Sequence, residues 1–388
     1  MSTSDRWACI ARMGGFGDNL IATSVFKGLK KRYDRLEVIA GEPMHVMYEN
    51  NPYIDKLTVL PKDVPQWGDG HSWHKWFHDR GREYAFFANL SHSCEVTGVA
   101  LKIQTIFWWP DNMRRKTFNR SYLEIVHDIC DVPYEEIEPA FFPTDEERTQ
   151  AAETKAKVGP QCIGWVMSGS RLDKIHPEID VAITRILRDL KIPVIIFGAP
   201  GKDYELAKMI EAEVKKRLHT TEGLHLALSP DAANPTWGPR RICAQAQVCD
   251  LVVGPDTGPM WAVASQPMPK VLLASHAGGH NITAHWKNTT TLEADRERVP
   301  CYPCHRLHDD PSTCKPNVDG NGAACISDIS VDTIVSTVQH LLEEQEHGKH
   351  QRLFAKTDAG LDPHRPDGNP PDHVGNRSFP RVAHFNLG

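Results

Sequence analysis

The fold class is decided by residues 7–18, which read WACIARMGGFGD. The first seven residues form a short apolar run, typical of a buried strand, and the glycines end it. After the glycines, Leu20, Val25, Phe26 and Leu29 recur at the spacing of one helix face. A strand that passes through a glycine turn into an amphipathic helix predicts the first half of a βα unit.

The same alternation continues along the chain and is interrupted once, by a polar, helix-prone connector at 144–160. Short apolar runs separated by helical patterns indicate parallel sheets. The further strands are predicted at 36–40, 57–60, 84–90, 162–167, 193–198, 224–228, 251–254 and 270–275. The helices of the second half are predicted at 177–190, 203–218, 240–248, 257–265 and 330–346.

Two such sets, each of ordinary domain size, predict an α/β protein with two Rossmann-like, doubly wound domains that face each other across a cleft. We expect an N-terminal domain at 1–155 and a C-terminal domain at 156–346. Residues 347–388 are rich in Pro, Gly, Asp and His and predict a flexible tail. The Trp- and His-rich segment 65–82 predicts a surface insertion.

Composition narrows the function classes. The 44 Lys and Arg against 50 Asp and Glu give a net charge of −6, which argues against a general nucleic-acid binder. No apolar run approaches the roughly 20 residues that span a bilayer, and the N-terminus lacks the features of a signal peptide. We therefore expect a cytoplasmic protein with at most peripheral contact to a membrane.

The glycine turn at 14–19 is the first candidate site, because ligands of doubly wound sheets bind beyond the carboxyl ends of the strands. A dinucleotide fingerprint would need Gly where Leu20 stands, and a P-loop would need a Lys that is absent. Asp18 is unusual in a loop that would otherwise bind an anion. It can cap the following helix, or it can project into the cleft as a general base.

Two further loops suit a phosphate group. At 254–260 the order is GPDTGPM, where Thr257 is a good helix N-cap and the amides of Thr257, Gly258 and Met260 face a ligand. At 168–174 the order is SGSRLDK, where hydroxyls and two cations suit a diphosphate. Its donor-binding candidates are Ser168, Ser170, Arg171 and Lys174. An ordinary capped helix and a solvated loop are the alternatives.

Taken together, the motifs resemble glycosyltransferase family 9, which includes the ADP-heptose:lipopolysaccharide heptosyltransferases. The resemblance spans roughly residues 7 to 345. It is carried by Gly17-Asp18 with Thr23, by 51–55 (NPYID), by Ser168-Gly169-Ser170 with Lys174, and by 256–260 (DTGPM). Two positions depart from the family pattern: Trp261 stands where the family usually has His, and Ser24 where Pro is common.

The resemblance implies a GT-B architecture and an inverting, metal-independent sugar transfer from a nucleotide-diphosphate donor such as ADP-heptose. No separate cofactor is then required, and the acceptor is a glycan or glycolipid of the bacterial surface. Asp18 matches the family's catalytic base, and Lys174 matches a basic residue near the diphosphate. Asp256, Thr257 and Gly258 match the donor-binding turn, and Gly17 belongs to the base loop.

Two other functions stay open at this point. A nucleotide-sugar epimerase would use the same fold but would need further cleft carboxylates and His residues that the sequence does not reveal. A binding module that has lost turnover is suggested by Trp261, although Asp18 and Lys174 argue against it. An NAD-dependent oxidoreductase is disfavoured by Leu20 and by the lack of an acidic ribose ligand after the second strand.

Ten cysteines raise the question of a metal. Six of them lie in apolar surroundings and predict buried, reduced thiols: Cys9, Cys94, Cys130, Cys162, Cys243 and Cys249. Cys301, Cys304, Cys314 and Cys325 have the thiol count of a zinc site, but only the first two have the usual ligand spacing. Whether they bind a metal stays open.

The insertion 65–82 offers a second, weaker candidate metal site. His71, His74 and His78 could share one helix face, but a surface loop is the preferred interpretation. Its Trp residues, with Trp108 and Trp109, could instead stack on acceptor sugars or pack in a core.

Overall fold

The computed structural model describes residues 5–60, 70–91, 93–167, 172–231, 236–308, 314–317 and 322–358. The chain forms two compact units, Met1–Leu342 and Glu343–Gly388. Both predicted Rossmann-like sheets lie in the first unit.

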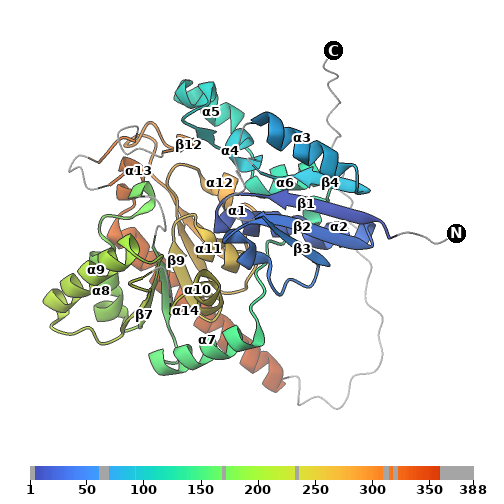
Figure 1. Cartoon of the computed structure of the whole chain (residues 1–388). Coiled ribbons are helices and arrows are strands. Elements are labelled where there is room, and N and C mark those ends of the chain that lie inside the picture. Colours follow the sequence, from blue (N-terminus) through green and yellow to red (C-terminus); the bar gives the residue numbers. More distant parts are fainter. Residues whose placement is uncertain are drawn as a thin grey trace, which may run out of the picture. The chain divides into compact units, whose positions relative to one another are not determined.

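The first sheet has four parallel strands in the order β3-β2-β1-β4 (Figure 1). Residues 8–12 of β1 are buried, as expected for a central parallel strand with both faces covered. The strands are β1 (Trp7–Arg12), β2 (Arg35–Gly41), β3 (Lys56–Leu60) and β4 (Phe86–Asn89). The helices of this N-terminal lobe are α1 (Phe16–Ala22), α2 (Phe26–Arg32), α3 (Gly70–Gly81), α4 (Ser93–Thr97), α5 (Asp111–Thr117) and α6 (Tyr122–Cys130).

The second sheet has six parallel strands in the order β11-β10-β9-β6-β7-β8. The strands are β6 (Ile163–Val166), β7 (Val194–Phe197), β8 (Leu224–Ala227), β9 (Leu251–Gly254), β10 (Lys270–Leu273) and β11 (Thr289–Leu292). The helices of this C-terminal lobe are α8 (Ile179–Arg185), α9 (Lys202–Leu218), α10 (Pro239–Ala246), α11 (Gly258–Val263), α12 (Gly279–Ile282) and α13 (Ala324–Ser327). The connector is α7 (Asp145–Val158), capped by Thr144 as its polar pattern predicts.

Each sheet has one point at which the strand order reverses. In the first sheet it lies between β1 and β4, and in the second between β6 and β9. Loops that leave neighbouring strands in opposite directions open a crevice at such a point, and ligands of this fold class bind there. The segments that follow these strands carry Asp18, in the first turn of α1 after β1, Lys174 after β6 and Asp256 after β9. Three of the site residues that the sequence predicted therefore lie in segments at the two switch points.

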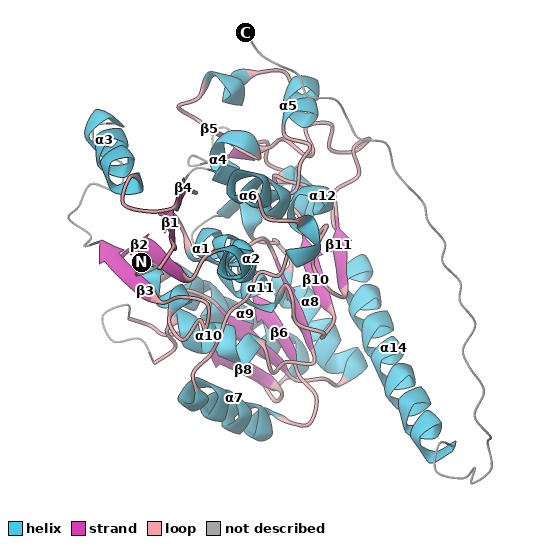
Figure 2. Ribbon diagram, turned by 90° about the vertical axis from the view of Figure 1, so that its right-hand side faces the viewer, coloured by secondary structure: helices cyan, strands magenta, loops and turns pink. Residues whose placement is uncertain are grey.

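A continuous apolar core joins the two lobes. One cluster of buried side chains contains Leu20 and Phe26 of the N-terminal lobe together with Met260 and Trp261 of the C-terminal lobe. Helix α1 packs against α11, and the two lie side by side at the centre of Figure 2. A second link is a short parallel ladder between β5 (Ala100–Leu101) and β12 (Arg306–Leu307). The lobes therefore touch directly on the α1 side of the predicted cleft.

Arg240 of α10 forms a polar link between the lobes. Its guanidinium donates to both oxygens of Glu147 at 2.7 Å and to the carbonyls of Val46 at 2.7 Å, Glu49 at 3.1 Å and Phe142 at 3.0 Å. The Arg240 side chain is 10% exposed. Arg240→Met would leave Glu147 and three carbonyls without this partner. We expect the free energy of unfolding, measured by chemical denaturation, to fall by about 3–5 kcal/mol.

The matched control is Arg241→Met, on the same helix. Arg241 donates to one carbonyl, that of Thr236 at 2.8 Å, and stacks on Trp237. We expect its loss to cost about 1 kcal/mol or less. Equal losses for the two variants would show that Arg240 does not link the lobes.

Two segments differ from the sequence prediction. Residues 70–81, predicted as a surface loop, form α3, in which Phe77 packs against Phe87 of β4. The closing helix, predicted to end at 346, is α14 (Val331–Asp358) and continues twelve residues further. No helix in the described ranges is both long enough and apolar enough to cross a bilayer.

Candidate active site

Asp18 caps the start of helix α1, which is one of the two roles that the sequence left open. Its Oδ2 accepts a hydrogen bond of 2.7 Å from the backbone N–H of Gly15, the N-cap residue of α1. Its Oδ1 lies 3.0 Å from a guanidinium nitrogen of Arg12, and the side chain is 30% exposed. A carboxylate offers about four lone-pair positions, so these two contacts leave room for an acceptor hydroxyl.

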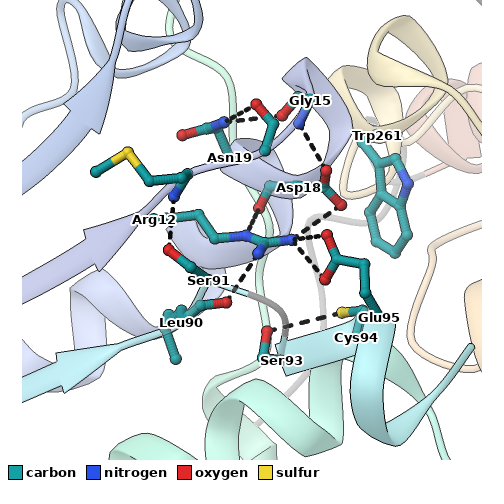
Figure 3. A network of polar contacts seen from close by, with 12 residues as sticks. Arg12, Gly15, Asp18, Asn19, Leu90, Ser91, Ser93, Cys94, Glu95 and Trp261 are labelled. Atoms are coloured by element: carbon teal, nitrogen blue, oxygen red, sulfur yellow. Dashed lines mark hydrogen bonds and ion pairs between the residues drawn. The ribbon is translucent and has the colours of Figure 1, made fainter. Parts of the chain in front are cut away.

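Arg12 is the residue that holds this arrangement together. Its side chain is 1% exposed, and its Nη1 donates to the carbonyl of Leu90 at 2.9 Å. Its Nη2 lies between Asp18 and Glu95, 3.3 Å from Oε1 of Glu95 (Figure 3). Arg12 ends β1, whereas Leu90 and Glu95 follow β4, so the cluster spans the switch point of the first sheet.

The surroundings raise the pKa of Asp18. Burial of the carboxyl contributes most, and the negative charges of Glu95 and Asp256 add to it, while Arg12 and the Gly15 N–H oppose the shift. A carboxyl group whose pKa is raised holds a proton better than an ordinary Asp. This is the direction that a general base at neutral pH requires.

The second cluster lies at the switch point of the other sheet. Lys174 donates to the backbone carbonyl of Asp256, and its Nζ lies 3.3 Å from Oδ2 of the same residue. The indole N–H of Trp261 donates to Oδ1 of Asp256 at 2.7 Å. Trp261 is 1% exposed and packs edge-on against Trp286. Lys174 and Trp261 thus hold the two oxygens of Asp256 in place. Trp261, which stands where glycosyltransferase family 9 usually has His, has the structural role of fixing one of these oxygens.

Two glycines bring the clusters together. A Cβ on Gly17 would lie 3.1 Å from Cδ1 of Trp261 and 3.6 Å from the backbone nitrogen of Gly258. A Cβ on Gly258 would lie 2.9 Å from the Cβ of Phe16. The backbones can meet this closely only because neither position carries a side chain. Figure 3 shows Trp261 beside the carboxylates of Asp18 and Glu95.

Two details of the predicted donor turn need correction. Helix α11 begins at Gly258 and is six residues long, shorter than the 257–265 predicted. Thr257 is its N-cap residue, but its hydroxyl does not accept a bond from the helix; it donates to the carbonyl of Pro255 at 3.4 Å. Met260 is fully buried, so only its backbone could face a ligand. Lys174 adds a full positive charge beside the backbone amides of this turn.

The three remaining donor candidates cannot be placed. Ser168, Ser170 and Arg171 lie outside the described residues. Lys174 follows them and ends a short 3₁₀ turn, Leu172–Lys174.

The cysteines divide as the sequence predicts. The six predicted core thiols are buried and unpaired. Cys301, Cys304, Cys314 and Cys325 line one cavity of about 60 Å³, together with His308. Burial raises the pKa of Cys304 to about 12, so this thiol stays protonated. Across the described parts of the chain, no three His, Cys, Asp or Glu side chains are grouped to hold a metal ion.

The His and Trp residues that the sequence proposed for metal binding or sugar stacking lie in different surroundings. His78 lies on α3, whereas the side chains of His71 and His74 are outside the described part of the structure. Trp108 is 61% exposed, and Trp109 is half-buried. An exposed Trp108 is consistent with a sugar-stacking role, which stays a prediction.

Solved structures share this architecture. A glycosyl transferase of family 9 from Veillonella parvula aligns with 87% of this chain and 98% of its own, with a TM-score of 0.60 and 16% identity. ADP-heptose lps heptosyltransferase II from E. coli aligns with 87% of this chain and 99% of its own, with a TM-score of 0.55 and 14% identity. No protein-family model and no curated protein matches the sequence. At this identity the likeness shows the fold: the chain has the two-sheet GT-B architecture of these glycosyltransferases.

Proposed function

We propose that the protein is an inverting glycosyltransferase that moves a sugar from a nucleotide-diphosphate donor to an acceptor hydroxyl. One observation carries the proposal. The carboxylate of Asp18 and the Lys174–Asp256 pair lie at the switch points of two facing sheets, and the contact between Gly17 and Gly258 brings these loops together. In this proposal Asp18 is the base on one lobe, and the 256–258 turn, close to it on the other lobe, binds the diphosphate.

The reaction follows from these groups. The acceptor O–H gives its proton to Asp18 while its oxygen attacks the anomeric carbon of the donor. The bond between that carbon and the diphosphate oxygen breaks from the opposite face, which inverts the configuration. Lys174 and the backbone amides of the 256–258 turn stabilise the negative charge that builds on the departing diphosphate. No metal is needed in this scheme, because a lysine supplies the charge.

The donor and acceptor classes are the finer part of the proposal. The E. coli structure that this fold resembles is named for ADP-heptose and lipopolysaccharide. Together with the sequence motifs, this supports a heptose donor and a bacterial surface glycan or glycolipid as acceptor. Asp256, whose two oxygens are held by Lys174 and Trp261, is proposed to accept hydrogen bonds from the sugar. We further propose that the reaction occurs in the cytoplasm, at the inner face of the membrane when the acceptor is lipid-linked.

The proposal is tested by incubating the protein with a panel of ADP-, UDP- and GDP-sugars and a mixture of surface-glycan acceptors, with and without EDTA. We expect release of the nucleoside diphosphate from one donor, dependent on an acceptor and unaffected by EDTA. Conversion of the sugar without release would identify an epimerase. Donor binding without release or conversion would identify a binding module. Either result would overturn the proposal.

A further inference from the structure

Arg12 serves two carboxylates at once. Its Nε donates to the backbone carbonyl of Asp18 at 3.4 Å, and its Nη1 donates to the carbonyl of Leu90 at 2.9 Å. Its Nη2 is the nitrogen that meets the side-chain anions, and it lies 3.0 Å from Oδ1 of Asp18 and 3.3 and 3.4 Å from the two oxygens of Glu95. Asp18 and Glu95 therefore share one guanidinium nitrogen, whose two N–H groups can serve one carboxylate each.

The two carboxylates differ in their access to water. The Asp18 side chain is 30% exposed and the Glu95 side chain 14%, while Arg12 is 1% exposed. A guanidinium this deeply buried needs a negative partner at all times, because an unpaired buried charge costs several kcal/mol. The more buried Glu95 can supply that partner while the more exposed Asp18 meets a substrate.

The other groups around Asp18 do not supply a second positive charge for Asp18 and Glu95. Asp256, on the C-terminal lobe, is negative and is paired with Lys174. Cys94 and Tyr122 lie close enough to interact with Glu95 and Asp18, and Tyr48 with Arg12 and Asp18. Burial raises the pKa of these three groups, which keeps them neutral. Arg12 is thus the cation that the two carboxylates of its own lobe share.

We propose that Arg12 and Glu95 are positioning residues for the reaction proposed above: Arg12 holds the Asp18 carboxylate toward the donor turn, and Glu95 keeps Asp18 basic by sharing the charge of Arg12. The inference rests on the proposed function. When Asp18 accepts the acceptor's proton, its attraction to Arg12 weakens and Glu95 remains as counterion. After product release, the proton passes from Asp18 to water, and the shared arrangement returns.

The test replaces Glu95 by an uncharged residue of the same shape. In Glu95→Gln, Arg12 acts on Asp18 alone, so the pKa of Asp18 falls. Because the base must be deprotonated, the acidic limb of the pH–rate profile moves to lower pH, by about one unit. The weaker base also lowers the plateau kcat, by about threefold, while the KM for donor stays unchanged. Glu95→Asp keeps the charge and is expected to return the limb toward its wild-type position.

The matched control is Glu138→Gln, which removes a surface carboxylate that pairs with Lys27 and Lys287. We expect its profile to match the wild type. An unchanged acidic limb in folded Glu95→Gln, with transfer activity present, would overturn the inference and leave the proposed function standing. An acidic limb that moves by the same amount in Glu138→Gln would also overturn the inference.

A second readout separates this inference from the proposed function. The pKa of Asp18 is measured by 13C NMR of carboxyl-labelled aspartate, with the resonance assigned by its loss in Asp18→Asn. We expect the pKa to be lower in Glu95→Gln than in the wild type, even if no donor is turned over. A lowered pKa without turnover supports the Glu95 inference against the proposed function. An equal or higher pKa overturns the inference.

Discussion

Asp18→Asn is expected to fold and to bind the donor, but to turn it over at least about 10²-fold more slowly than the wild type, because the amide cannot take the acceptor's proton. The amide oxygen can still accept the N–H of Gly15, so the start of α1 is preserved. Turnover is measured as nucleoside diphosphate released per protein under saturating donor. Donor affinity is measured by calorimetry.

The control for this variant is Asp55→Asn. Asp55 is another aspartate of the N-terminal lobe that accepts bonds from cations, here Lys30 and Arg35, but it lies directly before β3 and not after β1. We expect its kcat to stay within a factor of about three of the wild type, since it performs no proton transfer. Near-normal kcat in Asp18→Asn, or an equal drop in Asp55→Asn, would remove Asp18 from the mechanism.

Lys174→Met is expected to lower kcat/KM for the donor by about 10²–10³-fold, the usual effect of removing one stabilising donor from a site of developing negative charge. The side chain is 11% exposed, and methionine fills a similar volume. The affinity of Lys174→Met for a nucleoside diphosphate is also expected to fall. The affinity for the nucleoside without phosphates is expected to stay the same. Calorimetric titration of both ligands measures this difference.

A purely structural role for Lys174 predicts a different pattern. If the lysine served only to hold Asp256, then Asp256→Asn, which weakens the same ion pair and leaves the lysine in place, would reduce diphosphate affinity equally. We expect Asp256→Asn to retain most of that affinity. Equal losses in the two variants, or a loss of nucleoside affinity in Lys174→Met, would contradict a direct role at the diphosphate.

The two-sheet fold could be predicted because its strands are short apolar runs that end at glycine or polar turns. The candidate residues could be predicted for the same reason: Asp18, Lys174 and Asp256 each lie in the segment that follows the end of a strand. The strand order could not be predicted as firmly. It makes β1 and β4 neighbours, and it places Glu95 beside Arg12 although 83 residues separate them.

Arg12 and Glu95 were missed for physical reasons. Arg12 ends an apolar strand, where a single charge gives no signal of its own, and Glu95 lies on the short helix α4 with no motif around it. A search of the loops on either side of an expected switch point would have found both. Trp261 was recognised only as a departure from a pattern. Its hydrogen bond to Asp256 depends on the turn geometry of α11, which composition and spacing do not reveal.

The two segments that differ from prediction do so for different physical reasons. The sequence Gly68-Asp69-Gly70 and the nearby Trp residues suggested a loop, but Phe77 of α3 is buried against the first sheet. Helix α14 continues to Asp358 through a polar stretch whose Gln, Lys, Arg and Ala content favours helix, with little periodicity to mark its end.

The most direct test is a crystal structure of the protein with a nucleoside diphosphate bound. We predict that the diphosphate lies against the amides of the 256–258 turn, with Lys174 in contact with it and the carboxylate of Asp18 facing the terminal phosphate across the space that the sugar would fill. A diphosphate bound elsewhere on the chain, or an Asp18 side chain directed away from it, would contradict the account.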